Sequence, residues 1–237
     1  VSPDQLIVTT GSQQALDLLG KTMISPGDKV IVEGPTFLAT IQCFRLYGAE
    51  LITAPVDGQG VQTDVLEALI AEHKPKLVYL IPTFGNPSGA TLSLGRRKKV
   101  LELAVKYNTL VVEDDPYGDL YFGKAPPPSL LALSKTVPGS RELLAHCGSL
   151  SKVLSPGLRV GWMIAPPELL AKATMCKQFS DAHTSTFAQA TAAQYLQAGR
   201  MPDTLAKVRA VYAERAHTMC DALHRELGNA IEFVAPK

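Results

Sequence analysis

Residues 148–162 read GSLSKVLSPGLRVGW, and this stretch decides how the rest of the chain is interpreted. Lys152 lies between small hydroxyl residues, and Arg159 follows seven positions later with no other charge between them. If burial strips the lysine ammonium of water, its pKa falls and the neutral amine becomes a nucleophile toward aldehydes. Ser149, Ser151 and the arginine can hold a dianionic phosphate. This combination is typical of an anchor for pyridoxal 5'-phosphate (PLP), although a surface Ser-Lys loop fits the same motif.

Composition places few limits on the function. The 237 residues are 46% hydrophobic and 19% charged, with 23 basic and 22 acidic side chains and a net charge of +1. This balance does not indicate a binder of nucleic acid or of a membrane surface. The four cysteines form no Cys-x-x-Cys pair and the five histidines show no ligand spacing. We therefore expect buried reduced thiols in a cytosolic protein, with no disulfide framework and no metal site.

Short β-branched runs alternate with longer segments that have apolar residues at helical spacing. This alternation predicts a three-layer α/β/α sandwich with a mostly parallel central sheet. In such sheets ligands bind beyond the carboxyl ends of the strands, so residues that follow strands matter most. The predicted strands are 6–8, 29–33, 50–54, 77–81, 110–113, 144–149 and 160–165. The predicted helices are 13–23, 38–47, 63–72, 93–107, 167–177, 186–197 and 203–227.

Two segments near the N-terminus follow predicted strands. The sequence TTGSQQAL at 9–16 turns at Gly11 into a helix, whose first backbone N–H groups, with the Ser12 hydroxyl, form an anion site. An ordinary serine N-cap explains the same residues. Phe37 follows the strand at 29–33 and can stack on a planar ring or simply pack in the core.

Two more segments follow strands in the middle of the chain. Asn86, within PTFGNPSG at 82–89, can donate its amide N–H to a phenolate oxygen, or can belong to a plain Asn-Pro turn. Residues 113–117 read EDDPY, and carboxylates at the end of a buried strand need a cation or a donor. A protonated pyridine nitrogen is such a cation. A magnesium site would need further oxygen ligands at strand ends, which the sequence does not show, so an acidic surface turn is the main alternative.

Taken together, these segments resemble the large domain of the fold-type I PLP-dependent aminotransferases of class I/II. The matching motifs run from Gly11 to Trp162. The EDDPY and GSQQAL sequences are similar to the aminoadipate/kynurenine aminotransferase branch. Phe37 departs from the pattern, because the family often has tyrosine at this position.

The resemblance implies a role for each motif residue. Lys152 is expected to form the aldimine with PLP and then to move the substrate proton. Asp114 is expected to pair with the pyridine nitrogen, and Tyr117 and Asn86 with the ring's 3-oxygen. These assignments make Lys152, Asp114 and Tyr117 the expected catalytic residues. Phe37 is expected to stack on the ring. The expected phosphate contacts are Gly11, Ser12, Gln13, Ser149, Ser151 and Arg159.

The resemblance also implies domain boundaries. Residues 1–230 are expected to form the PLP-binding large domain, and residues 231–237 to begin a small domain. Family members have a further N-terminal segment and a complete C-terminal domain. These segments supply the arginine that grips the substrate carboxylate and a partner-subunit tyrosine that reaches the phosphate. We therefore expect the isolated 237-residue chain to be incomplete for catalysis.

The expected activity is transfer of an amino group from an amino acid to a 2-oxo acid by a cytoplasmic homodimer. One alternative is the PLP-sensing domain of a MocR-type transcription regulator, although those proteins more often have Asp-Asp-Tyr-Asp where this chain has Asp-Asp-Pro-Tyr. Another is a β-lyase or decarboxylase reaction on the same fold. Nucleic acid and membranes are not expected partners of this segment.

Overall fold

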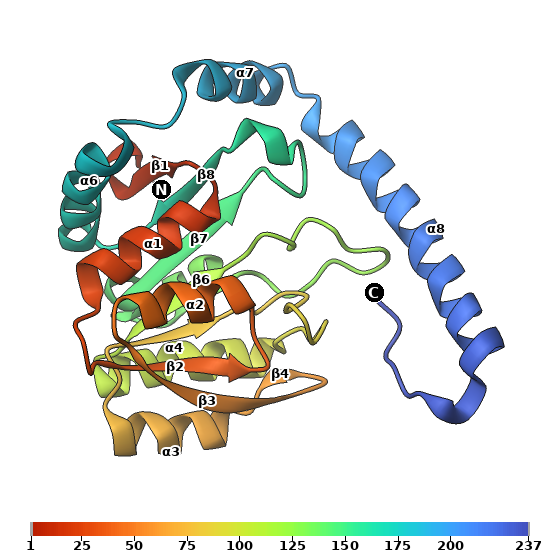
Figure 1. The fold of residues 1–237 in the computed structure, drawn as a ribbon, viewed down its shortest axis with the longest axis horizontal. Coiled ribbons are helices and arrows are strands. Elements are labelled where there is room, and N and C mark those ends of the chain that lie inside the picture. The colour runs from red at the N-terminus through yellow and green to blue at the C-terminus, as the bar shows by residue number, and fades with distance from the viewer. Residues whose placement is uncertain (1, 237) are drawn as a thin grey trace.

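The molecule is built around a central β-sheet. The computed structural model describes residues 2–236. Eight strands lie in the order β1-β8-β7-β6-β5-β2-β3-β4 (Figure 1). Strands β7, β6, β5, β2 and β3 are mutually parallel, whereas β8 runs antiparallel to both β7 and β1. The strands are β1 (Leu6–Thr9), β2 (Lys29–Gly34), β3 (Glu50–Asp57), β4 (Gly60–Val61), β5 (Leu77–Leu80), β6 (Leu110–Asp114), β7 (Leu144–Ser149) and β8 (Gly161–Ile164).

Helices cover both faces of the sheet because its central strands are apolar on both sides. Every residue of β5, β6 and β7 is buried. One core cluster joins the sheet to α1 (Ser12–Met23), α2 (Leu38–Leu46) and α6 (Pro167–Asp181). The other joins it to α3 (Thr63–His73), α4 (Leu94–Tyr107) and the short α5 (Leu130–Leu133). The three-layer α/β/α prediction is confirmed, since continuous apolar runs are what a doubly covered parallel sheet requires.

The predicted elements coincide with the observed ones to within a few residues. The main differences are α6, which continues to Asp181, and the two-residue strand β4, which the sequence did not predict. Asn108 ends α4 in the left-handed conformation, as expected for a helix C-cap. One composition-based expectation was too broad, because Cys147 alone among the four cysteines is buried.

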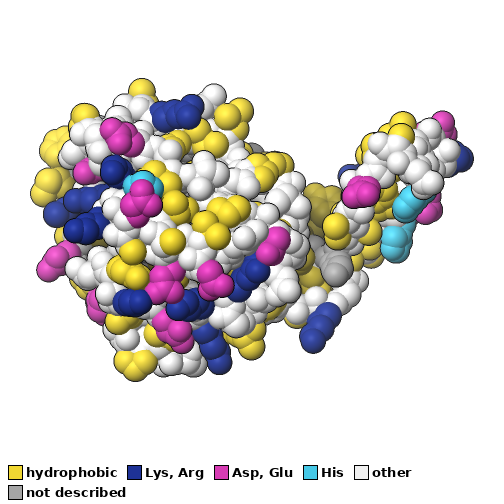
Figure 2. Space-filling view, turned by 90° about the horizontal axis from the view of Figure 1, so that it is seen from below, with side chains coloured by type: hydrophobic (Ala, Val, Ile, Leu, Met, Phe, Trp, Pro, Cys, Tyr) yellow, Lys and Arg dark blue, Asp and Glu magenta, His cyan; other side chains and the backbone are white. Residues whose placement is uncertain are grey.

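Helix α7 (Thr186–Gln197) still packs on the body through Ala188 and Ala192, whereas the helix after it leaves the body of the molecule. Helix α7 leads into α8 (Met201–Leu227), which runs along one side and has no buried residue (Figure 1). In the space-filling view, the far end of this arm stands apart from the body (Figure 2). The tail then turns back, so that residues 234–236 line a cavity together with residues of the sheet's carboxyl edge. No helix within residues 2–236 is long and apolar enough to cross a membrane.

Candidate active site

The motif residues gather at one edge of the sheet because their strands are parallel neighbours. Strands β6 and β7 end at Asp114 and Ser149, and the loop that contains Asn86 follows β5. Phe37 follows β2 and stands immediately before α2. Gly11 follows β1, which runs in the same direction as β7 because both are antiparallel to β8. Residues up to about 140 positions apart in sequence thus face one region.

Asp114 is buried, with only 3% of its surface exposed. One of its two carboxylate oxygens has a hydrogen-bond donor. The Tyr79 hydroxyl donates to Oδ2 at 2.7 Å, whereas Oδ1 has no hydrogen-bond partner among residues 2–236. Burial raises the pKa of Asp114 to about 6. A buried carboxylate oxygen without a partner is costly unless a donor or cation occupies the adjacent space. Oδ1 therefore fits a ligand that presents a charged N–H group.

Ser149, Ser151 and Arg159 form one polar cluster. The Ser149 hydroxyl donates to Ser151 Oγ at 2.9 Å, and Arg159 donates to the same Oγ at 3.2 Å. The Arg159 guanidinium also donates to the carbonyl oxygen of Thr10 at 3.3 Å. The loop after β7 is thereby connected to the turn that starts α1. Two hydroxyls, one guanidinium and a helix N-terminus form a cradle suited to a phosphate dianion.

Gly11 is required where this cradle closes. Its φ is +78°, a left-handed conformation that side chains disfavour, and a Cβ there would overlap the Arg159 guanidinium. Helix α1 begins directly after it with no side-chain cap on its first turn. Ser12 is half-buried and Gln13 is exposed at that turn. The free backbone N–H groups of this turn are the usual anion-binding feature of a helix N-terminus.

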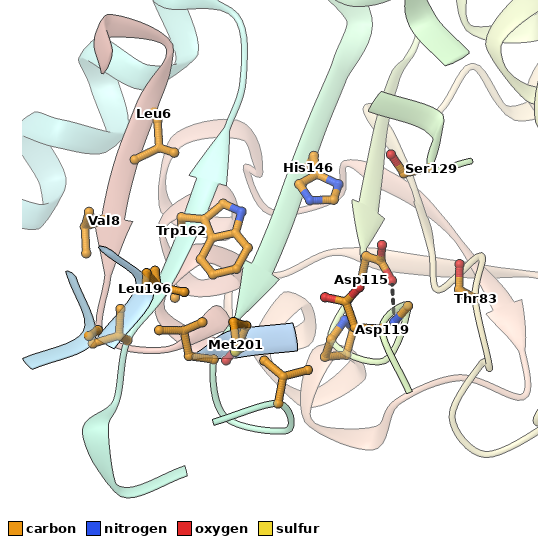
Figure 3. A pocket seen from close by; sticks show the side chains of 18 of the residues that line it. Leu6, Val8, Thr83, Asp115, Asp119, Ser129, His146, Trp162, Leu196 and Met201 are labelled. Atoms are coloured by element: carbon orange, nitrogen blue, oxygen red, sulfur yellow. Dashed lines mark hydrogen bonds between the residues drawn. The ribbon is translucent and has the colours of Figure 1, made fainter. Parts of the chain in front are cut away.

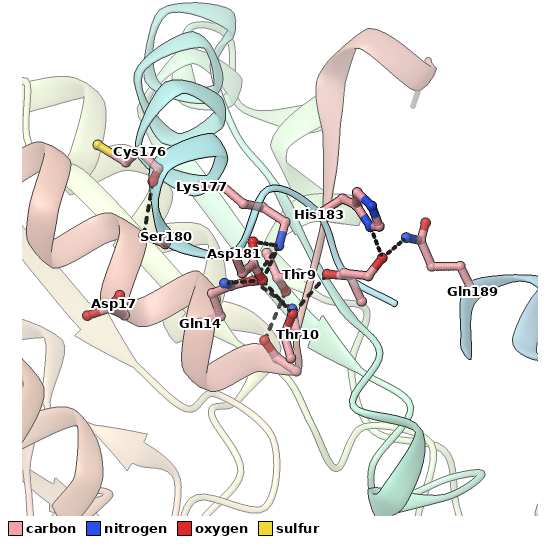
Figure 4. A network of polar contacts seen from close by, with 12 residues as sticks. Thr9, Thr10, Gln14, Asp17, Cys176, Lys177, Ser180, Asp181, His183 and Gln189 are labelled. Atoms are coloured by element: carbon pink, nitrogen blue, oxygen red, sulfur yellow. Dashed lines mark hydrogen bonds and ion pairs between the residues drawn. The ribbon is translucent and has the colours of Figure 1, made fainter. Parts of the chain in front are cut away.

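A polar network that sequence reasoning missed holds the Gly11 turn in place (Figure 4). Lys177 at the end of α6 is 5% exposed, and its Nζ donates to Asp181 at 2.8 Å and to Gln14 Oε1 at 2.7 Å. Asp181 also accepts from the hydroxyl of Thr10 at 2.9 Å. Residues 171 positions apart are thus bonded. No local pattern around Lys177 or Asp181 predicts this contact.

Lys152 corrects one premise of the sequence argument. A nucleophilic lysine was expected to have a buried amine, but the Lys152 side chain is exposed in this chain. It lies on the wall of a cavity of about 760 Å³ that also includes Tyr117, Phe84 and Val234. Lys152 is exposed because it follows the end of β7, where the chain has left the sheet. Any desolvation of its amine requires something else to fill this cavity.

The remaining motif residues are partly buried around the same edge. Phe37 packs against the core cluster beneath α1 and α2. Tyr117 is half-buried, and burial raises the pKa of its hydroxyl while the neighbouring Asn86 side chain acts in the opposite direction. Asn86 and Tyr117 are therefore close together, although they lie in different loops. The structure places all eleven predicted site residues at this edge.

Glu113 points to the other face of the sheet and meets a different environment. Its Oε1 and Oε2 accept from the backbone N–H groups of Leu130 and Leu131 at 2.6 and 3.0 Å. His146 Nδ1 lies 2.8 Å from Oε2, and the fully buried Arg97 lies 4.0 Å from Oε1. A cavity of about 880 Å³ adjoins this face, with His146 and Trp162 on its walls (Figure 3). Sequence reasoning had grouped Glu113 with Asp114 and missed this network.

The sequence and the structure were compared with those of known proteins. The aminotransferase class I and II family matches residues 1–237. The chain belongs to this family. It is 41% identical over 239 residues to 2-aminoadipate transaminase of Thermus thermophilus, and spans 100% of its own length but 59% of that protein. A crystal structure of α-aminoadipate aminotransferase from the same species, complexed with N-(5'-phosphopyridoxyl)-L-leucine, superposes with a TM-score of 0.95 at 40% identity. The chain covers 60% of that structure and is fully covered by it.

Regulatory proteins are also among the relatives. An uncharacterised HTH-type transcriptional regulator of Bacillus subtilis is 31% identical over 236 residues, which span the whole chain and 48% of the regulator. This identity is lower than that to the transaminase, so the regulator alternative has the weaker support.

Proposed function

We propose that this chain is the PLP-binding part of an aminotransferase that moves an amino group from an amino acid to a 2-oxo acid. The observation that carries the proposal is Asp114. Its buried, unpartnered Oδ1 stands at the same sheet edge as an exposed lysine and an uncapped helix N-terminus with an arginine beside it. The chain spans only 59% of its transaminase relative, so the activity proposed is that of the protein to which this part contributes.

The residues present fit PLP. Asp114 would accept the N–H of the pyridine ring through Oδ1, and Tyr117 and Asn86 would contact the 3-oxygen. Phe37 would cover one ring face. The phosphate would be held by the Gly11 turn, with Ser12 and Gln13, and by Ser149, Ser151 and Arg159. When bound, PLP supplies an electron sink for negative charge that develops at the substrate Cα.

The chain's own groups divide the remaining work. Asp114 would stabilise a proton on the ring nitrogen, because an ionised carboxylate beside a cation in a water-poor site is strongly favourable. Lys152 Nζ would hold PLP at its aldehyde carbon, with loss of water. Once the substrate amine has displaced it, the freed Nζ would take the proton from the substrate Cα and return it to the former aldehyde carbon of PLP. Tyr117 keeps its proton at neutral pH, since burial raises its pKa, and so can act as a donor.

Reductive labelling tests the role of Lys152. The protein is mixed with PLP at equal concentration, its visible absorbance is recorded, and borohydride is added. We expect a visible band, and peptide mass spectrometry should locate the cofactor on Lys152. Lys152→Ala should abolish both signals, whereas Lys124→Ala, at an exposed lysine of another loop, should leave them unchanged. Label spread over several surface lysines in both variants would contradict the proposal.

Two competing functions share this cofactor site. A PLP-sensing domain would bind the cofactor without turnover, and the regulator relative is the observation in its favour. A β-lyase or decarboxylase would turn over without an acceptor. Incubation of the whole protein with an amino acid, with and without a 2-oxo acid, separates the three: turnover that requires the 2-oxo acid supports transamination.

We also propose a domain boundary, an oligomeric state and a cellular location for this protein. We place the end of the large domain near residue 230, which is supported by the lack of buried residues in α8 and by the turn of the chain after it. Assembly as a homodimer is supported by exposed apolar side chains on α6 and α7, notably Phe179 and Phe187 at 88% and 79% exposure. A cytoplasmic setting is supported by four cysteines that are all free thiols.

A further inference from the structure

Tyr79 is the residue that hydrogen-bonds Asp114, the proposed partner of the cofactor nitrogen. It lies in β5, aligned with Val112 of β6, and therefore shares a sheet face with Asp114 two residues further along. Its hydroxyl donates to Asp114 Oδ2 at 2.7 Å, and its side chain is fully buried. Within residues 2–236 this is the one hydrogen bond that the Asp114 carboxylate makes.

Helix α2 fixes the tyrosine in turn. The ring of Phe44 meets the Tyr79 ring edge to face, with centroids 5.9 Å apart and planes at 89°. Thr40, one turn earlier and also fully buried, lies beside the hydroxyl. Burial and the neighbouring Asp114 raise the pKa of Tyr79 well above its usual value, so the hydroxyl keeps its proton and remains a donor. A buried tyrosine hydroxyl needs a hydrogen-bond partner, and the packing of the ring leaves Asp114 as that partner.

We propose that Tyr79 is a positioning residue, which holds Asp114 by Oδ2 so that Oδ1 stays turned toward the cofactor nitrogen and the carboxylate stays ionised. This inference rests on the proposed function. A carboxylate has two equivalent oxygens, so occupation of one by a rigid buried donor determines the direction of the other. Tyr79 does not itself need to touch PLP.

The electrostatics of Asp114 support the same role. Burial raises its pKa to about 6, and the hydrogen bond from Tyr79 works against that rise. Asp115, next along the chain, raises the pKa further, and His146 in β7 lowers it. Cys147, the β7 residue aligned with Asp114, has a thiol whose pKa burial raises well above its usual value, so it stays neutral. Loss of the Tyr79 hydroxyl should therefore raise the Asp114 pKa above 6.

Tyr79→Phe tests the inference without requiring turnover. In the cofactor-free protein, folded Asp114 binds its proton up to about pH 6 and unfolded Asp114 only to about 3.8. Its contribution therefore lowers the free energy of unfolding as pH rises through that interval. In Tyr79→Phe the decline should extend above pH 6. In an Asp114→Asn background the same substitution should leave the pH profile unchanged. PLP should bind Tyr79→Phe about tenfold more weakly.

Matched controls separate positioning from general damage. Tyr47→Phe removes another tyrosine–aspartate hydrogen bond, to Asp17, at a distance from the site, and should shift neither the PLP affinity nor the Asp114 interval. If Tyr79→Phe does not fold, Phe44→Leu, which removes the ring packed against Tyr79, should produce the same pH shift to a smaller degree. Equal profiles for Tyr79→Phe and Tyr47→Phe, or a shift that persists in Asp114→Asn, would overturn the inference. Unchanged PLP binding in Asp114→Asn would instead overturn the proposed function beneath it.

Discussion

Glu113 and Asp114 are adjacent in β6, equally buried, and opposite in what surrounds them. Glu113 faces the α4 and α5 side, where two backbone N–H groups, His146 and Arg97 satisfy both of its oxygens. Asp114 faces the α1 and α2 side, where Tyr79 satisfies one oxygen and nothing in the described chain satisfies the other. The pleat of the strand alone sends them to different faces.

The difference separates a carboxylate that stabilises the fold from one that is available for chemistry. Leu130 and Leu131 begin α5, so Glu113 joins that helix to the sheet. Arg97 donates to the Pro82 carbonyl oxygen at 2.7 Å and to Thr83 Oγ1 at 2.9 Å, and so connects the same network to the loop before Asn86. Burial and charge are alike for the two acids. The number of unsatisfied oxygens distinguishes them.

Glu113→Ala should have the largest effect, and it should be on stability. Removal of one member of a buried charged network leaves His146 and Arg97 without their partner, which costs about 3–5 kcal/mol. Denaturant unfolding of the cofactor-free protein measures this loss. Glu67→Ala, which removes an ion-paired acid from the protein surface, should cause a much smaller loss. If the two variants lose the same free energy of unfolding, Glu113 is not the stabilising acid that its contrast with Asp114 implies.

Asp114→Asn should have the converse effect. Loss of the ring-nitrogen partner should lower turnover of the whole protein about 10²–10³-fold, or about 3–4 kcal/mol in activation free energy. The cofactor-free variant should be as stable as the parent at pH 7 or more so, because burial raises the pKa of Asp114 to about 6 and its charge is then a cost. Steady-state kinetics and unfolding together check this. A variant that is both active and unstable would place Asp114 with Glu113.

Glu33 offers an intermediate case at the end of β2. It is 6% exposed and accepts one hydrogen bond, from the Ile81 N–H at 2.8 Å. Burial raises its pKa to about 7, from 4.5. The folded state therefore keeps the Glu33 proton to a higher pH than the unfolded state does. The free energy of unfolding should fall as pH rises from about 4.5 to 7.

Glu33→Gln should remove that part of the pH dependence and add at most about 3 kcal/mol above pH 7, since each pKa unit corresponds to about 1.4 kcal/mol. Unfolding curves at pH 5 and pH 8 measure the effect. Asp57→Asn, at a partly exposed carboxylate paired with Arg96, serves as the control and should not flatten this interval. If Glu33→Gln loses stability at both pH values, Glu33 is a structural acid like Glu113.

Local pattern was sufficient for much of this protein. The runs KVIVE, LVYLI and LVVE predicted strands because continuous apolar sequence of that length fits a sheet covered on both faces. The Ser149–Lys152 motif, the Gly11 turn and the Asn86 loop were located because each follows such a strand. Tyr79 was missed even though it had a signal: a tyrosine inside a wholly apolar strand needs a hydrogen-bond partner.

Other features had no local signal. The contact of Lys177 and Asp181 with Gln14 joins helix α6 to helix α1, more than 160 residues earlier in the chain, and its residues look like ordinary helix surface. The exposure of Lys152 depends on where the loop after β7 leaves the sheet. The buried Arg97, in the basic run GRRKK, looks in sequence like its neighbours, which are half-buried or exposed.

By itself, the sequence determined which elements form and which residues end the strands, because side-chain periodicity and turn chemistry act over a few residues. It also predicted the set of groups that we propose to hold PLP. Only the tertiary structure decided which of three consecutive acids keeps a buried oxygen without a partner among residues 2–236, and which tyrosine binds its other oxygen. It also decided which lysine is buried in an ion pair and which is exposed. Those outcomes depend on hydrogen-bond partners from distant segments, and burial makes each unmatched atom costly enough to matter.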